Sequence, residues 1–132
     1  MTPEQKNRIA HEKIMGLCWH EPELKGGSDN HYNNWVSHNC KHCGEHCSIP
    51  ILRPVNPDYY HSIADALELV EKMIEGGWWF ERRQGPNDYN YAEFSKIEEE
   101  DNTILESNYV FGAELTPAAA ITDAALKAIG ED

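Results

Sequence analysis

The sequence predicts an α+β protein in which a three-stranded antiparallel sheet is layered with about three helices and zinc holds an N-terminal loop. Apolar residues recur at intervals of three and four in segments 1–15, 62–75 and 116–129, which indicates amphipathic helices. Between the last two helices, aromatic and β-branched runs alternate with short turns, which indicates an antiparallel meander. All four cysteines and five of the seven histidines lie in 18–47. This clustering predicts that a metal ion, rather than an apolar core, orders that part of the chain.

The chain of 132 residues is predicted to form one domain, 1–132, in which a zinc-binding loop, 18–47, precedes the rest. The remainder, 48–132, is expected to comprise a connector, a helix, a meander sheet and a C-terminal helix. Eleven basic and 23 acidic side chains give a formal charge of −12, which disfavours nucleic-acid phosphates and anionic membranes. No run of 18 apolar residues is present to span a membrane. We therefore expect a cytoplasmic protein that binds neither nucleic acid nor membranes directly.

The first helix is predicted to begin at Pro3, with Thr2 as its N-cap and Gln5 completing a capping box. It should run to about Met15 and end at Gly16, which delivers the chain directly to the first cysteine. Its buried side is expected to consist of Ile9, Ala10, Ile14 and Met15.

The loop that follows is predicted to bind zinc. Residues 21–37 are polar and poor in aliphatic side chains, so they cannot bury enough surface to offset about 1–2 kcal/mol of backbone entropy per residue. Zinc takes four ligands in a tetrahedron and suits thiolates and imidazoles. Two close pairs supply them, one being Cys-x-His and the other Cys-x-x-Cys followed by a glycine. The predicted metal ligands are Cys18, His20, Cys40 and Cys43.

The sequence leaves this ligand set open to exchange. Further residues are near enough to replace one of the four, namely Cys47, His38, His42 and His46. Unliganded thiols, a disulfide framework with three possible pairings, and a Cys-x-x-Cys redox motif are further interpretations. Against disulfides, residues 1–13 are charged and offer no apolar signal-peptide core.

After the loop, three prolines in 48–57 predict an extended connector on the surface. A second helix should begin after Ser62, with Asp65 three residues later, and stop at Gly76. Its apolar positions recur at helical spacing; they are Ile63, Ala66, Leu67, Val70, Met73 and Ile74.

Three strands are predicted next, at 78–83, 89–97 and 104–113, with the last one interrupted by the polar residues 106–108. A turn at 85–88 and a charged connection at 98–102 join them. In the middle strand, one face should carry Tyr89, Tyr91, Glu93 and Ser95, and the other Ala92 and Phe94.

The third helix should open at Thr116-Pro117 by the same device as the first and end at Gly130. Its apolar side is expected to be a narrow stripe of Ala118, Ile121, Ala125, Ala128 and Ile129. Small alanines would let this helix sit close to whatever it covers.

Several short motifs resemble those of the phage ABA-sandwich-domain family, a group of small bacteriophage and prophage proteins. They are Met15-Gly16-Leu17-Cys18-Trp19-His20-Glu21, Asn56-Pro57-Asp58-Tyr59-Tyr60, Val70-Glu71-Lys72-Met73, Trp78-Trp79-Phe80 and the alanine-rich end of the last helix, Ala124 to Ala128. The resemblance implies a fold and a phage origin, and no settled activity.

Some members of that family carry Cys-x-His and Cys-x-x-Cys-Gly at the corresponding places. This pattern fits Cys18, His20, Cys40 and Cys43, and the chain departs from it by adding Cys47 and further histidines. That departure leaves the ligand set open.

Catalytic motifs are absent from the sequence. His11-Glu12 and His20-Glu21 lack the second histidine of a His-Glu-x-x-His helix. No His-x-Glu precedes the Cys-x-x-Cys, as a zinc deaminase requires. We therefore predict a non-enzymatic, zinc-stabilised phage accessory protein that acts by binding another protein, of the host if the chain is phage-encoded.

Two further functions stay open. One is an acidic inhibitor of a host defence or nucleic-acid-handling protein, with Glu98 to Asp101 imitating phosphates. The second is a small zinc-dependent hydrolase whose metal keeps an open position for water. The sequence leaves the oligomeric state and the identity of the partner open.

Overall fold

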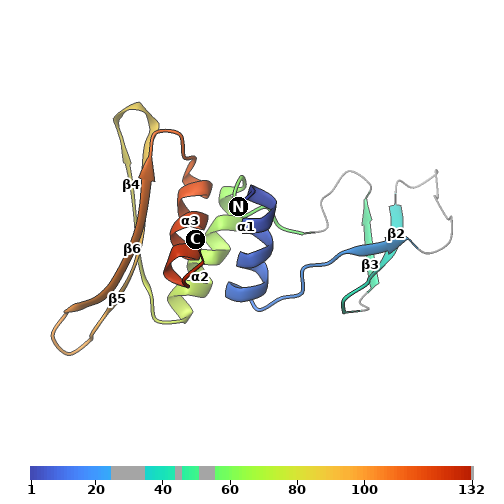
Figure 1. Cartoon of the computed structure of the whole chain (residues 1–132), viewed down its shortest axis with the longest axis horizontal. Helices are drawn as coiled ribbons and strands as arrows, with labels where there is room; N and C mark the ends of the chain where they lie inside the picture. The colour runs from blue at the N-terminus through green and yellow to red at the C-terminus, as the bar shows by residue number, and fades with distance from the viewer. Residues whose placement is uncertain (25–34, 44–45, 51–55, 132) are drawn as a thin grey trace. The chain divides into compact units, whose positions relative to one another are not determined.

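The computed structural model describes residues 1–24, 35–43, 46–50 and 56–131, with the backbone alone in 22–24, 35–39 and 46–50. The chain forms two compact units (Figure 1). The first, here called the helix–sheet unit, consists of Met1–Gly16 and Asp58–Asp132. The second, here called the cysteine unit, consists of Leu17–Pro57 and includes the predicted zinc-binding loop. The division into one domain over 1–132 stays a prediction.

The helix–sheet unit has the predicted α+β architecture of three helices and a three-stranded antiparallel sheet in the order β4-β5-β6. Its elements are α1 (Pro3–Ile9), which continues as a π-helix η1 (Ala10–Ile14), α2 (Ile63–Glu75), β4 (Trp79–Gly85), a 3₁₀ turn η2 (Pro86–Asp88), β5 (Tyr89–Ile97), β6 (Ile104–Gly112) and α3 (Pro117–Ala128). The third strand, β6, runs through residues 106–108 without the predicted interruption, and its pairing with β5 has a register shift between Lys96 and Ile97.

The three helices begin where the capping residues predict. The Thr2 hydroxyl accepts a hydrogen bond from the Gln5 N–H at 3.2 Å, and the Gln5 side chain accepts one from the Thr2 N–H at 2.8 Å. The hydroxyls of Ser62 and Thr116 likewise accept hydrogen bonds from the N–H groups of Asp65 and Ala119 at the starts of α2 and α3, without the reciprocal bond. The first helix differs from expectation after Ile9, because the Met15 N–H bonds to the Ala10 carbonyl five residues back. Each cap satisfies N–H groups that the first helical turn leaves without a partner.

Helices α2 and α3 cover one face of the sheet, and α1 lies on their far side (Figure 1). Ala92 and Phe94 of β5 are fully buried against these helices, as the strand alternation predicts. The narrow apolar stripe predicted for α3 is wrong: Ala119, Ala120 and Leu126 are buried as well. The helix lies between the sheet and α1, so it is enclosed almost all round.

The face predicted for α2 is also partly wrong. The helix buries Ala66, Leu69, Val70 and Met73, which follow the spacing of a single core-facing stripe. Three apolar residues expected in the core are exposed instead: Ile63, Leu67 and Ile74. Apolar spacing alone could not show which side of this apolar-rich helix the sheet would cover.

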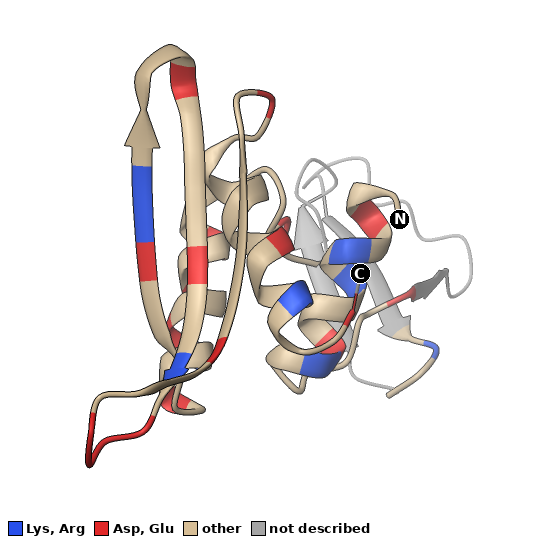
Figure 2. Ribbon diagram, turned by 60° about the vertical axis from the view of Figure 1, so that its left-hand side comes forward, with Lys and Arg blue, Asp and Glu red and all other residues tan. Residues whose placement is uncertain are grey.

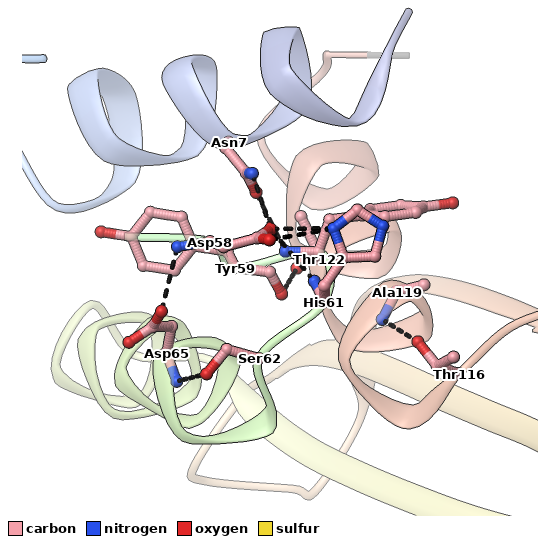
Figure 3. A network of polar contacts seen from close by, with 10 residues as sticks. Asn7, Asp58, Tyr59, His61, Ser62, Asp65, Thr116, Ala119 and Thr122 are labelled. Carbon is pink, nitrogen blue, oxygen red and sulfur yellow. Dashed lines mark hydrogen bonds and ion pairs between the residues drawn. The ribbon is translucent and has the colours of Figure 1, made fainter. Parts of the chain in front are cut away.

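Hydrogen bonds of the segment that precedes α2 tie the three helices together (Figure 3). The Asn7 amide of α1 donates to Asp58 Oδ1 at 2.8 Å, and the Asp58 N–H donates to Asp65 Oδ2 at 2.9 Å. Thr122 of α3 donates its hydroxyl proton to the Tyr59 carbonyl at 2.7 Å, with both residues fully buried. These bonds fix how the helical layers pack in the helix–sheet unit.

The cysteine unit contains a second antiparallel sheet, which the sequence patterns did not predict. Its strands are β1 (Pro22–Leu24), β2 (Trp35–Cys40) and β3 (His46–Pro50), in the order β1-β2-β3. Residues 48–50, predicted as the start of an extended connector, belong to β3. No helix in the described part of the chain is long and apolar enough to cross a membrane.

Candidate metal centre

Strand pairing brings the two predicted ligand pairs together. Cys40 ends β2 and stands opposite Pro22 of β1, so the segment leading into β1 places Cys18 and His20 beside it. Cys43 follows in the turn between β2 and β3. The Lys41 N–H also donates to the Glu21 carbonyl at 3.0 Å, which extends the backbone pairing past the end of β2.

The four side chains converge to a metal-sized cluster. One ligand atom from each of Cys18, His20, Cys40 and Cys43 lies within 4.8 Å of all the others. The sulfurs of Cys18 and Cys40 are 3.8 Å apart, and the Cys43 sulfur is 3.5 Å from His20 Nδ1. In a tetrahedral zinc site, bond lengths of about 2.3 Å to sulfur and about 2.0–2.1 Å to nitrogen give ligand separations of about 3.8 and 3.5 Å. The four predicted residues can therefore hold a metal ion.

Burial is graded across the cluster. Cys40 is 2% exposed, Cys18 and His20 are half-buried, and Cys43 is exposed. The His42 backbone N–H donates to the Cys40 sulfur at 3.4 Å. An amide proton aimed at a buried sulfur favours its thiolate form, which is the form that binds a metal.

The thiols differ in acidity. Burial opposes ionisation of Cys40, but the backbone N–H groups of Cys43 and His42 and the His20 side chain lower its pKa to about 5. Burial and the neighbouring Cys43 and Cys40 side chains raise the pKa of Cys18 to about 12. Three sulfurs this close cannot all be thiolates unless a cation offsets their repulsion. Metal binding at this cluster therefore has to release protons.

Asn56 holds the backbone of His20 in place. Its Oδ1 accepts a hydrogen bond from the His20 N–H at 2.9 Å, and its Nδ2 donates to the His20 carbonyl at 2.7 Å. In the sequence, Asn56 stands out only within a short motif that resembles one of a phage protein family, without any link to the ligands. No local spacing could have supplied that link, because the two residues are 36 positions apart.

Glu21 is not a member of the cluster, but it connects the segment that carries Cys18 and His20 to the turn between Cys40 and Cys43. Its carboxylate pairs with Lys41 Nζ at 2.6 Å and with His42 Nε2 at 2.9 Å. These hydrogen bonds, that of Lys41 first, lower the pKa of Glu21 to about 2. His42, which the sequence allows as a replacement ligand, is thus directed at Glu21 and is absent from the four-residue cluster.

Three further residues could replace a ligand by their place in the sequence, namely His38, His46 and Cys47. Their side chains lie outside the described residues, although the backbone pairs His38 with Cys47 across β2 and β3.

The described cysteines, Cys18, Cys40 and Cys43, form no disulfide with one another. The sulfurs of Cys18 and Cys40, at 3.8 Å, lie far beyond the bonded distance of about 2.05 Å. The thiols of these three residues are therefore available to a metal ion.

Comparisons with known proteins return no match: no protein-family model, no curated protein and no solved structure matches the chain. The candidate site therefore rests on the geometry and chemistry of its own residues.

Proposed function

We propose that the protein is a non-enzymatic binding protein whose cysteine unit is folded around one structural zinc ion, held by Cys18, His20, Cys40 and Cys43. The observation that carries this proposal is the convergence of four ligand atoms from separate chain segments within 4.8 Å. Three sulfurs and one imidazole form a donor set that suits the borderline-soft zinc ion and is common in structural sites.

The arrangement supports a structural role better than a catalytic one. Four protein ligands complete a tetrahedron and leave no position for a reactive water, which a zinc hydrolase requires. The strands of the cysteine unit are short, with three, six and five residues. Zinc binding contributes an apparent free energy on the order of 10 kcal/mol, which is comparable to the net stability of a small domain.

A phage or prophage origin and a protein partner in the host cytoplasm complete the proposal. The resemblance of several short motifs to those of the phage ABA-sandwich-domain family supports the origin. The net charge of −12 supports a partner that is not itself a polyanion. This charge disfavours direct contact with nucleic acid or anionic lipid, because both would be repelled.

The metal content of the purified protein and of two matched cysteine variants tests the proposal. We expect one zinc per chain in the unaltered protein and in Cys47→Ser, and loss of zinc in Cys40→Ser, because Cys40 is the buried member of the cluster. Both variants remove one sulfur from the cysteine unit, so they differ in position and not in chemistry. Zinc retained by Cys40→Ser but lost by Cys47→Ser would overturn the ligand set. Absence of zinc from all three proteins, even after incubation with the metal, would overturn the structural zinc.

A further inference from the structure

The face of the β4-β5-β6 sheet that points away from the helices carries a continuous aromatic surface. We call Tyr89, Tyr91, Tyr109 and Phe111 the aromatic face. Strand register places Phe111 opposite Tyr91, and the rings of Tyr109 and Phe111 lie 5.9 Å apart with planes only 15° from parallel. Tyr91 and Tyr109 are also 5.9 Å apart, at 27°, and Tyr89 and Phe111 are 5.6 Å apart, at 38°. Each of the four rings therefore neighbours at least one other, which makes the aromatic face continuous.

Half of the aromatic face is open to solvent, whereas Tyr89 and Tyr91 are half-buried. Tyr109 is 45% exposed and Phe111 is 53% exposed. Together with Arg83, Gln84 and Gly85 of β4, the aromatic face lines a shallow cavity of about 460 Å³. The uncovered face of an antiparallel sheet is ordinarily polar, so clustered exposed rings on it indicate a binding surface.

Carboxylates lie directly beside the rings. Glu93 of β5 stands opposite Tyr109 on one side and opposite Glu81 of β4 on the other. Its Oε2 accepts hydrogen bonds from the Ser107 hydroxyl at 2.8 Å and the Tyr91 hydroxyl at 2.9 Å. The bond from Ser107 contributes most to lowering the pKa of Glu93, which keeps the group ionised. Like charges directly opposite on neighbouring strands destabilise a sheet. Arg83 lies near both carboxylates and offsets part of this cost, and a further cation would offset more of it.

The same rings already accept cations from the chain itself. The guanidinium of Arg83 lies 4.5 Å from the centre of the Tyr91 ring, and the Lys127 ammonium lies 5.4 Å from that of Tyr109. Figure 2 shows acidic and basic residues side by side on the strands of this sheet. Arg83 also pairs with Glu81, at 3.3 Å. Aromatic stacking combined with a nearby carboxylate is thus the way this surface holds a guanidinium.

The charge of the whole chain selects among the possible occupants. Single-stranded nucleic acid stacks on exposed aromatic side chains, but it does so in positively charged grooves, whereas this chain carries a net charge of −12. A second copy would bring the same charge to the contact. A cationic segment is attracted by that charge and suits both the rings and Glu93.

We propose that the aromatic face binds a basic peptide segment of a partner protein, with an arginine stacked on Tyr109 and Phe111 and paired with Glu93. This inference specifies the kind of partner that the proposed binding protein recognises, and it rests on that proposed function. All residues of the aromatic face belong to the helix–sheet unit, so the test is independent of the zinc ligands.

The test titrates the whole 132-residue chain with a labelled peptide of alternating arginine and serine, and with a lysine–serine peptide of equal length and charge. We expect the arginine peptide to bind more tightly, and Phe111→Ala and Glu93→Gln each to weaken it about 3- to 10-fold. Glu93→Gln keeps a hydrogen-bond acceptor while removing the charge. Ile74→Ala, which shortens an exposed apolar residue of α2, is the matched control and should leave binding unchanged. Thermal unfolding of each variant verifies its fold.

Several results would overturn the inference. The first is that neither peptide binds, or that both bind equally with no effect of Phe111→Ala or Glu93→Gln. The second is that a proline-rich peptide or a single-stranded oligonucleotide binds more tightly than the arginine peptide. The third is that the protein self-associates and Phe111→Ala abolishes this association. Zinc content is measured on the same samples. Zinc present without peptide binding would reject the basic-peptide site alone, and peptide binding without zinc would reject the structural metal alone.

Discussion

The side chain of Asn56 hydrogen-bonds to the backbone of His20 at two points. Its Oδ1 accepts from the His20 N–H at 2.9 Å, and its Nδ2 donates to the His20 carbonyl at 2.7 Å. An asparagine side chain has one acceptor and one donor group, which match the N–H and the carbonyl of a single residue's backbone. Because His20 is the one imidazole in the cluster, its backbone position decides whether Nδ1 reaches the sulfurs. The ligands select the metal, and residues outside them set the geometry.

We therefore expect Asn56→Ala to weaken zinc binding about 10-fold, toward the lower end of the range for residues that support metal ligands. At saturating zinc the variant should still bind one ion, because all four ligands remain. Competition with a chromophoric chelator measures the affinity. Asn108→Ala, which removes an asparagine of β6 whose amide bonds to Glu106, is the control and should bind zinc like the unaltered protein. An affinity unchanged in Asn56→Ala would contradict the positioning role.

Among the elements, α3 depends most on close packing. Alanines form much of its surface, and Ala118, Ala120, Ala124 and Ala125 belong to the main core cluster. Small side chains let a helix approach the sheet on one side and other helices on the other, and little space remains for a larger group.

Ala124→Leu should accordingly destabilise the helix–sheet unit by about 1–3 kcal/mol, the usual cost of overpacking a dense core. The midpoint of urea unfolding, followed by circular dichroism, measures this change, provided that the dependence of the unfolding free energy on urea concentration is the same in both proteins. The same substitution at the exposed Ala113, after β6, should shift the midpoint little. An unfolding midpoint unchanged in Ala124→Leu would show that α3 does not pack as closely as its burial indicates.

Local signals predict much of this architecture, and long-range packing limits the rest. Thr2, Ser62 and Thr116 mark helix starts because a cap acts within three residues. Spacing likewise predicts the Cys-x-His and Cys-x-x-Cys pairs. The enclosure of α3 and the exposure of Leu67 depend on which elements pack against each helix. The spacing of apolar residues along the sequence does not identify those elements. The sheet β1-β2-β3 was not predicted because its polar strands lack a clear alternation of apolar and polar residues.

At the scale of the molecule, each of the two units is stabilised internally by a different interaction. The buried apolar clusters of the described residues consist entirely of residues from the helix–sheet unit. In the cysteine unit, the buried hydrophobic residue among those described is Cys40, a predicted metal ligand. Hydrophobic burial stabilises the first unit, and the second is expected to depend on metal binding.

Removing the metal should therefore unfold the cysteine unit and leave the helix–sheet unit folded. After treatment with a zinc chelator, limited proteolysis followed by mass spectrometry should show rapid cleavage within 17–57 and persistence of a fragment from 58 onward. The far-ultraviolet circular dichroism of the helices should change little, because α1, α2 and α3 all belong to the helix–sheet unit. Zinc added in excess of the chelator should preserve protection and serves as the control. Simultaneous loss of the helical signal and of protection across the chain would show that the metal stabilises both units, and unchanged protection of 17–57 would show that it stabilises neither.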